Sequence, residues 1–569
     1  MTPLTSPSVC KPETHVTPVL TVENLTVALP AAADRKHAIS DISFTLDAGE
    51  ILCIVGESGS GKSVTANAVM GLLPPALKIE SGKIRLHDRE IRDLSATERA
   101  RLNGRVVSMI FQDPLSALNP LMTVGQQIEE VMQTHGDATF SGAVSDEANT
   151  GSSPGIALNR SDRRARVIEL LDMVGLPNPQ AMAHQYPFRL SGGQRQRVMI
   201  AMALALDPDL LIADEPTTAL DVTTQAQILD IIGRLQRQKK MAVMFITHDF
   251  GVVADIADKV IVMEKGHLIE QGTAQAVLRA PREPYTQRLL AAIPTMRTEA
   301  RAPVSAAAPV VLDVRNLKKC YRSGGGFFGR QSLIQAVDDV SLTLRKGETI
   351  GIVGESGSGK STLGRMVMKL LDSDSGQIIL DCEDAVSMPE SRFRQKRPYI
   401  QMVFQDPFAS LNPRHTIERS LVCGPMSFGM PHREAHANAV RLLNRVELPE
   451  HALERYPHEF SGGQRQRIGI ARALMFNPVL LVADEAVSAL DVSIQAQVLQ
   501  LLDEIQQETR IAMMFITHDL RVASQICDRI AVLRRGRLVE LAPAHELFSA
   551  PRDAYTKSLV EAIPGWGGR

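Results

Sequence analysis

The stretch IVGESGSGKS at residues 54–63 occurs a second time, letter for letter, at residues 352–361. Each copy begins with the last two residues of a short apolar run, ILCIV (51–55) or ETIGIV (348–353). An apolar run before such a segment is typical of a strand that leads into a glycine-rich loop. In such a loop the backbone N–H groups surround a phosphate, and the dipole of the following helix adds positive potential. The repeat therefore predicts two phosphate-binding loops in one chain.

Each loop ends in a lysine and a serine with separate roles. We expect Lys62 and Lys360 to reach the β- and γ-phosphate oxygens, and the hydroxyls of Ser63 and Ser361 to bind Mg²⁺. The predicted ATP-binding residues are Gly56, Glu57, Ser58, Gly59, Ser60, Gly61, Lys62, Ser63 and Val64 in the first loop, and Gly354, Glu355, Ser356, Gly357, Ser358, Gly359, Lys360, Ser361 and Thr362 in the second.

The rest of the chain is duplicated as well, so that it consists of two homologous halves. The matching pairs are FQDPLSALNP (111–120) with FQDPFASLNP (404–413), LSGGQRQR (190–197) with FSGGQRQR (460–467), IADEPTTALDV (212–222) with VADEAVSALDV (482–492), and FITHD (245–249) with FITHD (515–519). The first half is longer than the second between its FQDP and SGGQ motifs. We interpret the extra residues, near 134–158, as a surface loop to which we assign no function.

Apolar runs alternate with helical stretches in both halves, which favours an α/β fold. At 569 residues the chain is also too long for a single core. We expect a flexible, polar N-terminus over 1–18, a first domain over 19–294, an Ala/Pro-rich linker over 295–309 and a second domain over 310–569.

An acidic pair follows one buried-strand pattern in each half, Asp214–Glu215 after LLIA and Asp484–Glu485 after LLVA. A carboxylate at the end of a buried strand can hold the Mg²⁺ shell. The acid that follows lies at the carboxyl edge of the sheet, where it can polarise an attacking water. We therefore predict a metal-supporting Asp and a catalytic Glu in each half.

The SGGQ motif begins a helical stretch in each half and predicts a second anion-binding helix N-terminus, separate from the phosphate loop. Its residues are predicted ATP contacts: Ser191, Gly192, Gly193 and Gln194 in the first half, and Ser461, Gly462, Gly463 and Gln464 in the second.

In this order, the motifs resemble the ATP-binding-cassette (ABC) ATPases over nearly the whole chain. The resemblance implies an α/β fold of two tandem P-loop NTPase cassettes, each with a RecA-like α/β core, an antiparallel β subdomain and a helical subdomain. It implies Mg²⁺ contacts from Ser63, Gln112, Asp214, Ser361, Gln405 and Asp484. It implies catalytic roles for Glu215, Glu485, His248, His518, Gln112 and Gln405, and places Asp221 and Asp491 where the two ATP sites are linked.

In this family one ATP lies between two cassettes, so neither cassette completes a site alone. The resemblance implies that Lys62, Glu215 and His248 share one ATP with Ser461 and Gly463. It implies that Lys360, Glu485 and His518 share the other with Ser191 and Gly193. ATP would then close the two cassettes and hydrolysis would release them.

The two halves depart from the family pattern in different ways. The adenine-stacking aromatic is Tyr321 in the second half, whereas Leu29 takes its place in the first. Val64 stands where the second half has Thr362, so one phosphate-contacting hydroxyl is absent. We predict that both sites hydrolyse ATP but bind it with unequal affinity.

Among ABC proteins, the QDPxxxLNP motif resembles the peptide/nickel importer ATPases. So do PREPYTQRLLAAIP (281–294) and its echo PRDAYTKSLVEAIP (551–564). The resemblance implies a motor subunit for di- or oligopeptide import, with glutathione, nickel or antibiotic-peptide uptake as alternatives. It implies two transmembrane permease partners, an indirect extracytoplasmic substrate-binding protein, and a peripheral location on the cytoplasmic face of the inner membrane. Some relatives carry a cysteine cluster for iron–sulfur binding in this C-terminal segment, but no cysteine lies within 286–319 or after 527, and we expect no cluster.

Composition limits the alternatives. The net charge is −2 and the pI is about 6.7, which does not favour nucleic-acid binding. A twin-cassette translation factor would carry a long charged linker, and a DNA-repair cassette protein would carry CxxC pairs. The six cysteines are scattered, which fits a reducing cytoplasm, and the longest apolar run, VMIAMALAL (198–206), is about half the length that spans a bilayer.

Overall fold

The computed structural model describes residues 18–31, 33, 35–136, 159–218, 220–297, 299, 301–323, 332–406, 410–488 and 490–565. Most of the predicted N-terminal segment and of the extra loop near 134–158 therefore lies outside the described residues. The chain divides into two compact units. The first comprises Met1–Thr218, Ile228–His248 and Ile256–Thr286, and the second comprises Ala219–Gln227, Asp249–Asp255 and Gln287–Arg569.

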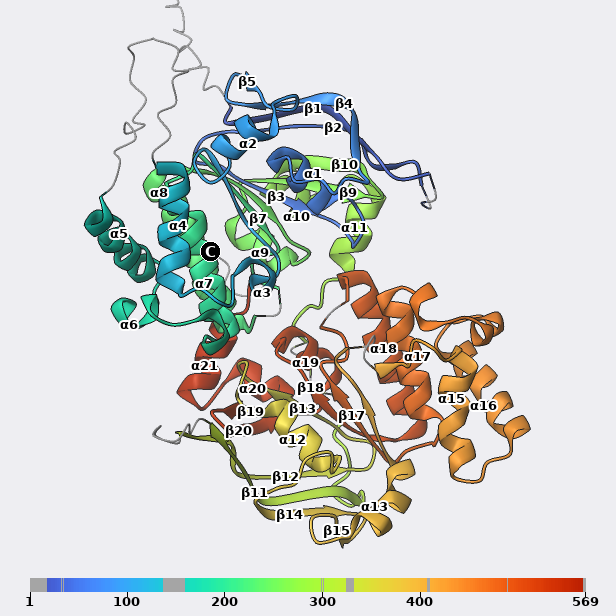
Figure 1. The fold of residues 1–569 in the computed structure, drawn as a ribbon. Helices are drawn as coiled ribbons and strands as arrows, with labels where there is room; N and C mark the ends of the chain where they lie inside the picture. The colour runs from blue at the N-terminus through green and yellow to red at the C-terminus, as the bar shows by residue number, and fades with distance from the viewer. Residues whose placement is uncertain are drawn as a thin grey trace, which may run out of the picture. The chain divides into compact units, whose positions relative to one another are not determined.

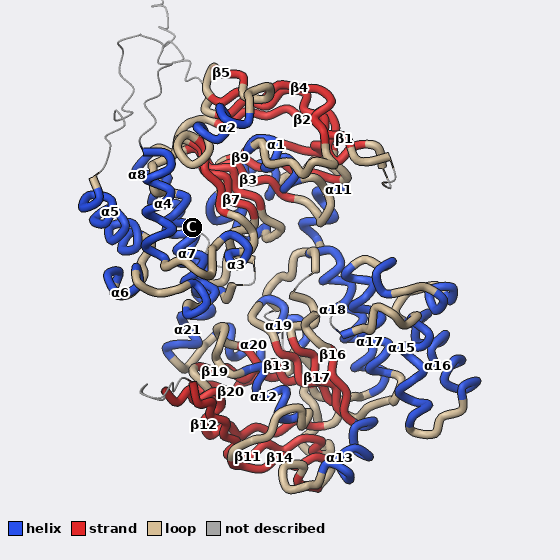
Figure 2. The backbone as a smooth tube through the Cα atoms, viewed as in Figure 1, coloured by secondary structure: helices blue, strands red, loops and turns tan. Residues whose placement is uncertain are grey.

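The first unit is built on a six-stranded sheet, parallel except at one edge (Figures 1 and 2). Its order is β10 (His267–Thr273), β9 (Lys259–Glu264), β3 (Ile51–Val55), β8 (Ala242–Ile246), β7 (Leu210–Asp214) and β6 (Val107–Ile110), with β10 antiparallel to β9. Every residue of β3, β7 and β8 is buried. The continuous apolar runs of these strands thus mark central strands that are covered on both faces.

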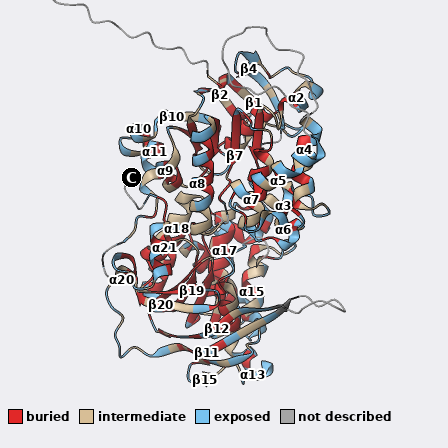
Figure 3. Cartoon of the chain, turned by 90° about the vertical axis from the view of Figure 1, so that its left-hand side faces the viewer, coloured by how far each residue is buried: buried red, intermediate tan, exposed pale blue. Residues whose placement is uncertain are grey.

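A second sheet of the first unit is antiparallel, in the order β2 (His37–Leu46), β1 (Leu20–Ala28), β4 (Lys78–Leu86) and β5 (Arg89–Glu90). One hydrophobic core contains residues of both sheets and of the helix that follows β3, among them Leu20, Ile54 and Ala66. The alternating burial along β1 and β2 agrees with strands that bury one face only (Figure 3).

The helices of the first half fall into two groups. One group, α4 to α7, forms a helical layer whose members contact one another, and others, such as α1 and α10, contact the sheets. The helices are α1 (Lys62–Met70), α2 (Ala96–Leu102), α3 (Pro114–Ala117), α4 (Val124–Gly136), α5 (Arg160–Met173), α6 (Pro179–Ala183), η1 (Pro187–Arg189), α7 (Gly192–Ala203), α8 (Val222–Lys239), α9 (Phe250–Ile256), α10 (Ala274–Arg279) and α11 (Pro284–Ala291).

The second unit repeats this architecture. Its six-stranded sheet runs β16 (Ile400–Val403), β17 (Leu480–Asp484), β18 (Ala512–Ile516), β13 (Thr349–Val353), β19 (Arg529–Arg534) and β20 (Arg537–Pro543). Its antiparallel sheet runs β12 (Ser332–Arg345), β11 (Val310–Ser323), β14 (Ser375–Leu380) and β15 (Glu383–Asp384). Its helices are α12 (Lys360–Val367), α13 (Glu390–Lys396), η2 (Arg397–Tyr399), α15 (Ile417–Ser427), α16 (His432–Arg445), η3 (Glu450–Glu454), η4 (Pro457–Glu459), α17 (Gly462–Leu474), α18 (Val492–Thr509), α19 (Leu520–Ile526), α20 (Ala544–Ser549) and α21 (Ala554–Glu561).

Each half therefore has a mostly parallel core sheet, an antiparallel sheet and a helical layer, as the sequence predicts. Across the described part of the chain, every helix is too short or too polar to span a membrane.

The chain between the halves is docked on the second unit at several places, of which Met296 and Arg301 are examples. Met296 packs against the core of that unit. The guanidinium of Arg301 donates to the carbonyl oxygen of Gln525 at 2.9 Å and pairs with Asp528 at 3.2 Å and with Asp503. The side chain of Arg301 is only 13% exposed, so this part of the predicted linker is held in place by charge and burial.

Candidate functional site

The two glycine-rich loops join a central strand to a helix, β3 to α1 and β13 to α12. Gly56 has φ +151°, and a Cβ there would lie 2.2 Å from the carbonyl oxygen of Met263. Gly354 has φ +147° and meets Leu533 in the same way, also at 2.2 Å. Only glycine fits where the loop backbone passes so close to the neighbouring strand end. The sequence repeat is thus also a repeat of backbone geometry.

The lysine at the end of each loop is buried, and its ammonium group bonds to the backbone of that loop. Lys62 is 6% exposed, and its Nζ donates to the carbonyl oxygens of Gly56 at 2.8 Å and Glu57 at 2.9 Å. Lys360 makes the same two bonds, to Gly354 at 2.8 Å and Glu355 at 2.9 Å. Burial lowers the pKa of Lys360, although the neighbouring carboxylates oppose this shift. Each ammonium group is therefore positioned within the loop in which a phosphate would be bound.

A serine and an aspartate lie together at each predicted Mg²⁺ position. The Oγ of Ser63 donates to Oδ1 of Asp214 at 3.0 Å, and Ser361 donates to Asp484 at 3.0 Å. Burial raises the pKa of both aspartates, and the serine hydrogen bond opposes this only in part. A hydroxyl and a buried carboxylate are hard oxygen donors of the kind Mg²⁺ prefers, so this pair of residues fits the ion.

The glutamates that follow β7 and β17 adopt a backbone conformation that non-glycine residues rarely take. Glu215 has φ +45° and Glu485 has φ +47°. The backbone N–H of Glu215 donates to the carbonyl oxygen of Ile246 at 2.9 Å, and that of Glu485 donates to the carbonyl oxygen of Ile516 at 2.9 Å. These bonds tie each glutamate to the end of the neighbouring strand. Left-handed non-glycine residues cost free energy and gather at functional sites, which agrees with the catalytic role predicted for this pair.

Three residues contact the Glu215 carboxylate in the first unit. The Nε2 of Gln112 and the Oγ1 of Thr218 each donate to Oε2 at 2.9 Å, and the Nδ1 of His248 lies 3.4 Å from Oε1. The structure thus brings together Gln112, Glu215 and His248, which the sequence had placed in three separate motifs. Thr218 was missed, because nothing distinguishes it from the other hydroxyls of the PTT segment.

The second unit repeats this cluster with one difference. The Nε2 of Gln405 donates to Oε2 of Glu485 at 2.7 Å, and the Nδ1 of His518 lies 3.6 Å from Oε1. Ser488, the counterpart of Thr218, donates instead to the backbone oxygen of Glu485 at 3.0 Å. The two carboxylates therefore have the same predicted partners and a different hydroxyl contact.

Burial opposes ionisation of Glu215, but the hydrogen bond and charge of His248, the Thr218 hydroxyl and the Lys62 charge outweigh it and lower the pKa to about 2. The pKa of Glu485 is also lowered, again because His518 and Lys360 overcome burial. Burial depresses the pKa of His518, yet its contact with Glu485 raises it overall. Both glutamates are thus ionised at neutral pH.

The SGGQ motifs lie at helix starts, as predicted. The Oγ of Ser191 accepts from the N–H of Gln194 at 3.3 Å, and the Gln194 side chain accepts from the Ser191 N–H at 3.0 Å, which forms a capping box at the start of α7. Ser461 and Gln464 form the same pair at the start of α17. The glutamine of each motif is thereby used in capping, a role that the S-x-x-Q spacing could have revealed.

Asp221 and its neighbours, although they belong to the first half of the sequence, form part of the second unit. Asp221 accepts from the Thr223 hydroxyl at 2.8 Å and from the backbone N–H of Ser356 at 3.4 Å. The Thr223 hydroxyl also lies 2.8 Å from Oε1 of Glu355. The ALD loop of the first half therefore contacts the second phosphate loop, and Thr223 is a contact that the sequence did not indicate. Asp491 occupies the N-cap position of α18.

The residues that distinguish the halves lie as follows. Leu29 and Val64 are half-buried against the core of the first unit, so both replacements add apolar packing where a ring or a hydroxyl was expected. Tyr321 lies on β11 with 40% of its surface exposed, and Thr362 is half-buried in α12. The pairing of Lys62 with Ser461, and of Lys360 with Ser191, joins residues of different units and stays a prediction.

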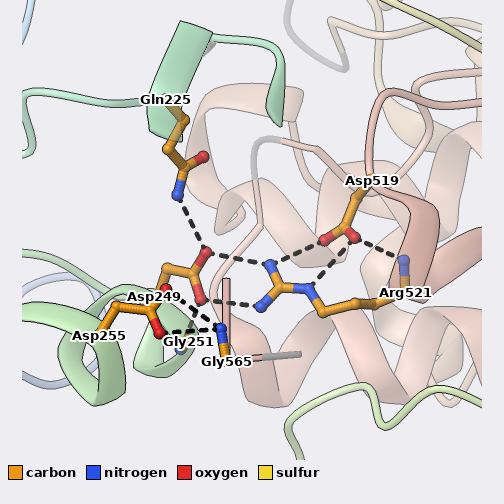
Figure 4. A network of polar contacts seen from close by, with 7 residues as sticks. All are labelled: Gln225, Asp249, Gly251, Asp255, Asp519, Arg521 and Gly565. Carbon is orange, nitrogen blue, oxygen red and sulfur yellow. Dashed lines mark hydrogen bonds and ion pairs between the residues drawn. The ribbon is translucent and has the colours of Figure 1, made fainter. Parts of the chain in front are cut away.

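A charged cluster in the second unit contains Asp249, Asp519 and Arg521 (Figure 4). Arg521 donates to both oxygens of Asp249 at 3.0 Å and to Asp519 at 3.1 Å. Asp249 directly follows His248 and Asp519 directly follows His518. Arg521 has Gly251 as its counterpart in the first half, so this contact exists once and the repeat gave no sign of it.

A buried parallel strand, a GxxxxGKS loop that opens a helix, and a carboxylate at the end of a neighbouring strand define a P-loop nucleotide-binding protein. The ABC transporter family model matches residues 39–218 and 337–488. The chain belongs to this family, and it is an ABC-type ATPase with two cassettes.

Further comparisons narrow the group within the family. Residues 269–330 and 539–568 match the model of the oligopeptide/dipeptide transporter C-terminal region, behind the first and second cassettes. The glutathione import ATP-binding proteins GsiA of Shigella dysenteriae serotype 1 (strain Sd197) and Escherichia coli (strain K12) are each 44% identical over 578 residues, which cover 96% of this chain and 89% of each relative. A dimeric ATP-binding cassette in a post-hydrolysis state, bound to ADP and Pi, is 29% identical and covers 41% of this chain and 98% of its own, with a TM-score of 0.38.

Proposed function

We propose that this chain is the ATP-hydrolysing subunit that drives an importer of di- and oligopeptides. The observation that carries the proposal is the match to the oligopeptide/dipeptide transporter C-terminal region, which comes after each of the two matches to the ABC transporter model. The GsiA relatives are named for glutathione import, and glutathione is itself a small peptide. Glutathione therefore falls within the proposed substrate class.

In the proposed mechanism, each phosphate loop holds the β- and γ-phosphates through its backbone N–H groups and its lysine. Mg²⁺, held by Ser63 and Asp214 or by Ser361 and Asp484, would neutralise phosphate charge. The ionised Glu215 orients the attacking water once Gln112 and His248 turn from its carboxylate to the nucleotide. Loss of the His248 contact would also raise the pKa of Glu215 toward the range of a useful base.

We place the two cassettes at residues 19–294 and 310–569. The SGGQ serines and glycines of each cassette would complete the ATP site of the other. ATP then favours the closed pair of cassettes, because the γ-phosphate supplies charge for the second helix N-terminus. Hydrolysis removes that charge and allows opening. The Asp221 contacts support a link between the ALD loop and the second phosphate loop.

Membership of an importer ATPase group implies permease partners in the membrane. We propose two permease subunits, fed by an extracytoplasmic binding protein, and a peripheral position on the cytoplasmic face of the inner membrane. Since substrate contacts would lie in those partners, this chain supplies ATP turnover rather than cargo recognition.

Uptake in the parent organism tests the proposal. The gene is deleted and replaced with the wild type or with Lys62→Ala plus Lys360→Ala, and uptake of labelled dipeptide, tripeptide and glutathione is measured. We expect the deletion and the double variant to lose uptake of at least one of these peptides, and the wild type to restore it. Normal uptake of all three in the deletion strain would contradict the proposal.

A further inference from the structure

The C-terminal segment behind the second cassette is anchored by one buried carboxylate. Glu540, in the middle of β20, is 9% exposed. Its oxygens accept from the backbone N–H groups of Arg552 at 3.0 Å and Asp553 at 3.1 Å. These bonds fix the chain just before α21 begins at Ala554. Residues 539–568, which contain this anchor, are those that match the transporter C-terminal region.

Capping then sets the direction of α21. The Asp553 side chain accepts from the backbone N–H of Tyr555 at 2.8 Å, which is an N-cap bond in the first turn of the helix. Tyr555 is only 6% exposed, and the guanidinium of Arg534 lies over its ring, 4.6 Å from the centroid. The ring is therefore held between its own helix and the end of β19.

The Tyr555 hydroxyl contacts the second phosphate loop. Its oxygen accepts a hydrogen bond from the backbone N–H of Glu355 at 3.3 Å. Burial raises the pKa of Tyr555 to about 12, so the hydroxyl is neutral at neutral pH. Glu355 is the residue directly after Gly354, the first glycine of the loop.

Other groups hold the remaining polar atoms of Glu355. Its carbonyl oxygen accepts from Lys360 at 2.9 Å, and Oε1 of its carboxylate lies 2.8 Å from the Thr223 hydroxyl, whose single hydrogen Asp221 also approaches. The first peptide of the loop is thus fixed by the loop lysine, by the ALD loop and by the C-terminal helix. A shift of α21 would change the direction in which the Glu355 peptide points.

From this arrangement we propose that Tyr555 is a positioning residue for the second ATP site, through which the C-terminal region sets the affinity of that site for ATP. The inference rests on the proposed function, because it takes the loop at 354–361 as an ATP-binding loop. Tyr555 acts on the loop backbone, so it affects binding of the phosphates rather than the chemical step.

The test introduces Tyr555→Phe into two variants of the full chain. In the Glu215→Gln variant, ATP turnover comes mainly from the second site. In the Glu485→Gln variant, it comes mainly from the first site. In the Glu215→Gln background we expect the KM for ATP to rise about 3- to 10-fold, the effect of one hydrogen bond, while kcat stays within about twofold. In the Glu485→Gln background we expect no change in KM. A loss of folding alone would lower kcat in both backgrounds and would not give this split.

Tyr399→Phe is the matched control, since Tyr399 belongs to the same unit and is 55% exposed; it should leave both constants unchanged. Arg534→Gln, which uncovers the Tyr555 ring without altering the helix, should raise the same KM by a smaller factor. A Tyr555→Phe protein with an unchanged second-site KM would overturn the inference while leaving the proposed function intact. A wild-type chain that hydrolyses no ATP would instead contradict the proposed function.

Discussion

At the scale of single residues, each half places a strained glutamate between a glutamine and a histidine. Glu215 and Glu485 are both left-handed, and each contacts the residues that the sequence motifs had singled out. The hydroxyl contact differs, because Thr218 reaches the carboxylate and Ser488 reaches the backbone. The two clusters therefore share their glutamine and histidine partners and differ in the hydrogen bond that the hydroxyl makes.

The first prediction concerns these two glutamates. Glu215→Gln and Glu485→Gln, made separately, should each lower steady-state ATP turnover, and the double variant should abolish it, because both carboxylates occupy equivalent positions. The amide keeps the size of the side chain and removes its charge. Malachite-green phosphate release at saturating Mg·ATP measures the effect. If either single variant keeps wild-type turnover, the expected equivalence of the two sites fails.

The second prediction concerns pH and the pair His518–Glu485. The pKa of His518 is raised above its ordinary 6.5, so its contribution to stability is complete below pH 6.5 and is lost as the pH rises through the folded value. The pKa of Glu485 is lowered below 4.5, so its contribution is complete above pH 4.5 and is lost as the pH falls.

The Tm difference between the wild type and His518→Gln should therefore be largest between pH 4.5 and 6.5 and should shrink toward pH 9. Differential scanning calorimetry across this range measures it. A difference that grows with rising pH would show that the pair does not stabilise the fold through the protonated histidine.

The sequence predicted the residues whose chemistry repeats in a fixed order, such as Gln112 and His248. It did not predict Thr218, Thr223 or Tyr555, because a single hydroxyl carries no pattern. Their importance arises from which backbone or carboxylate lies beside them in the fold. That proximity depends on packing, which no local spacing encodes.

At the scale of elements, the starts of α7 and α17 are formed by a serine cap and two glycines. In the second unit these glycines differ in their surroundings. A Cβ on Gly463 would lie 2.4 Å from Cγ2 of Ile494 in α18, whereas a Cβ on Gly462 would have no atom within 4 Å. The close approach of α17 and α18 therefore depends on the second glycine.

The third prediction uses these glycines as a matched pair. Gly463→Ala should lower the free energy of unfolding by about 1–3 kcal/mol, because the new methyl group forces α17 and α18 apart. Gly462→Ala should be neutral or stabilise the protein by up to about 1 kcal/mol, since alanine favours the helix. Thermal unfolding measures both. Equal effects of the two substitutions would refute the packing explanation, and adding Ile494→Ala to Gly463→Ala should recover part of the loss.

At the scale of the whole molecule, the second unit includes two segments of the first half of the sequence, 219–227 and 249–255. The charged cluster around Arg521 lies among them, with Asp249 and Asp519 on either side of one guanidinium. The side chains of all three residues are less than a quarter exposed. The two aspartates raise the pKa of Arg521 despite burial.

The fourth prediction tests this cluster. Arg521→Met should destabilise the protein by on the order of 3 kcal/mol, because it leaves two poorly solvated carboxylates without their cation. Arg535→Met, on an exposed arginine at the turn after β19, is the control and should be neutral. Calorimetry measures both, and adding Asp249→Asn should reduce the penalty of the Arg521 change. Absence of this coupling would contradict a direct ion pair.

The overall architecture could be predicted because duplication, strand patterns and motif order all favour two α/β cassettes. The arrangement of the unit boundaries could not, because Asp249–Asp255 belongs by sequence to one half and by contact to the other. Such an exchange depends on side chains that occur in one half only. Arg521, with Gly251 as its counterpart, is an example.

The Gly251 position has a consequence for how a duplicated gene can diverge. A Cβ at Gly251 would lie 2.8 Å from Nη1 of Arg521 and 2.9 Å from the carbonyl oxygen of Pro564, so the cluster leaves little room for a side chain at this position. Two copies of the first half would lack the cation, and two copies of the second would bring together two cations and their bulk. The cluster therefore needs one residue set of each kind, so after duplication the two half-sequences could no longer replace one another at this site.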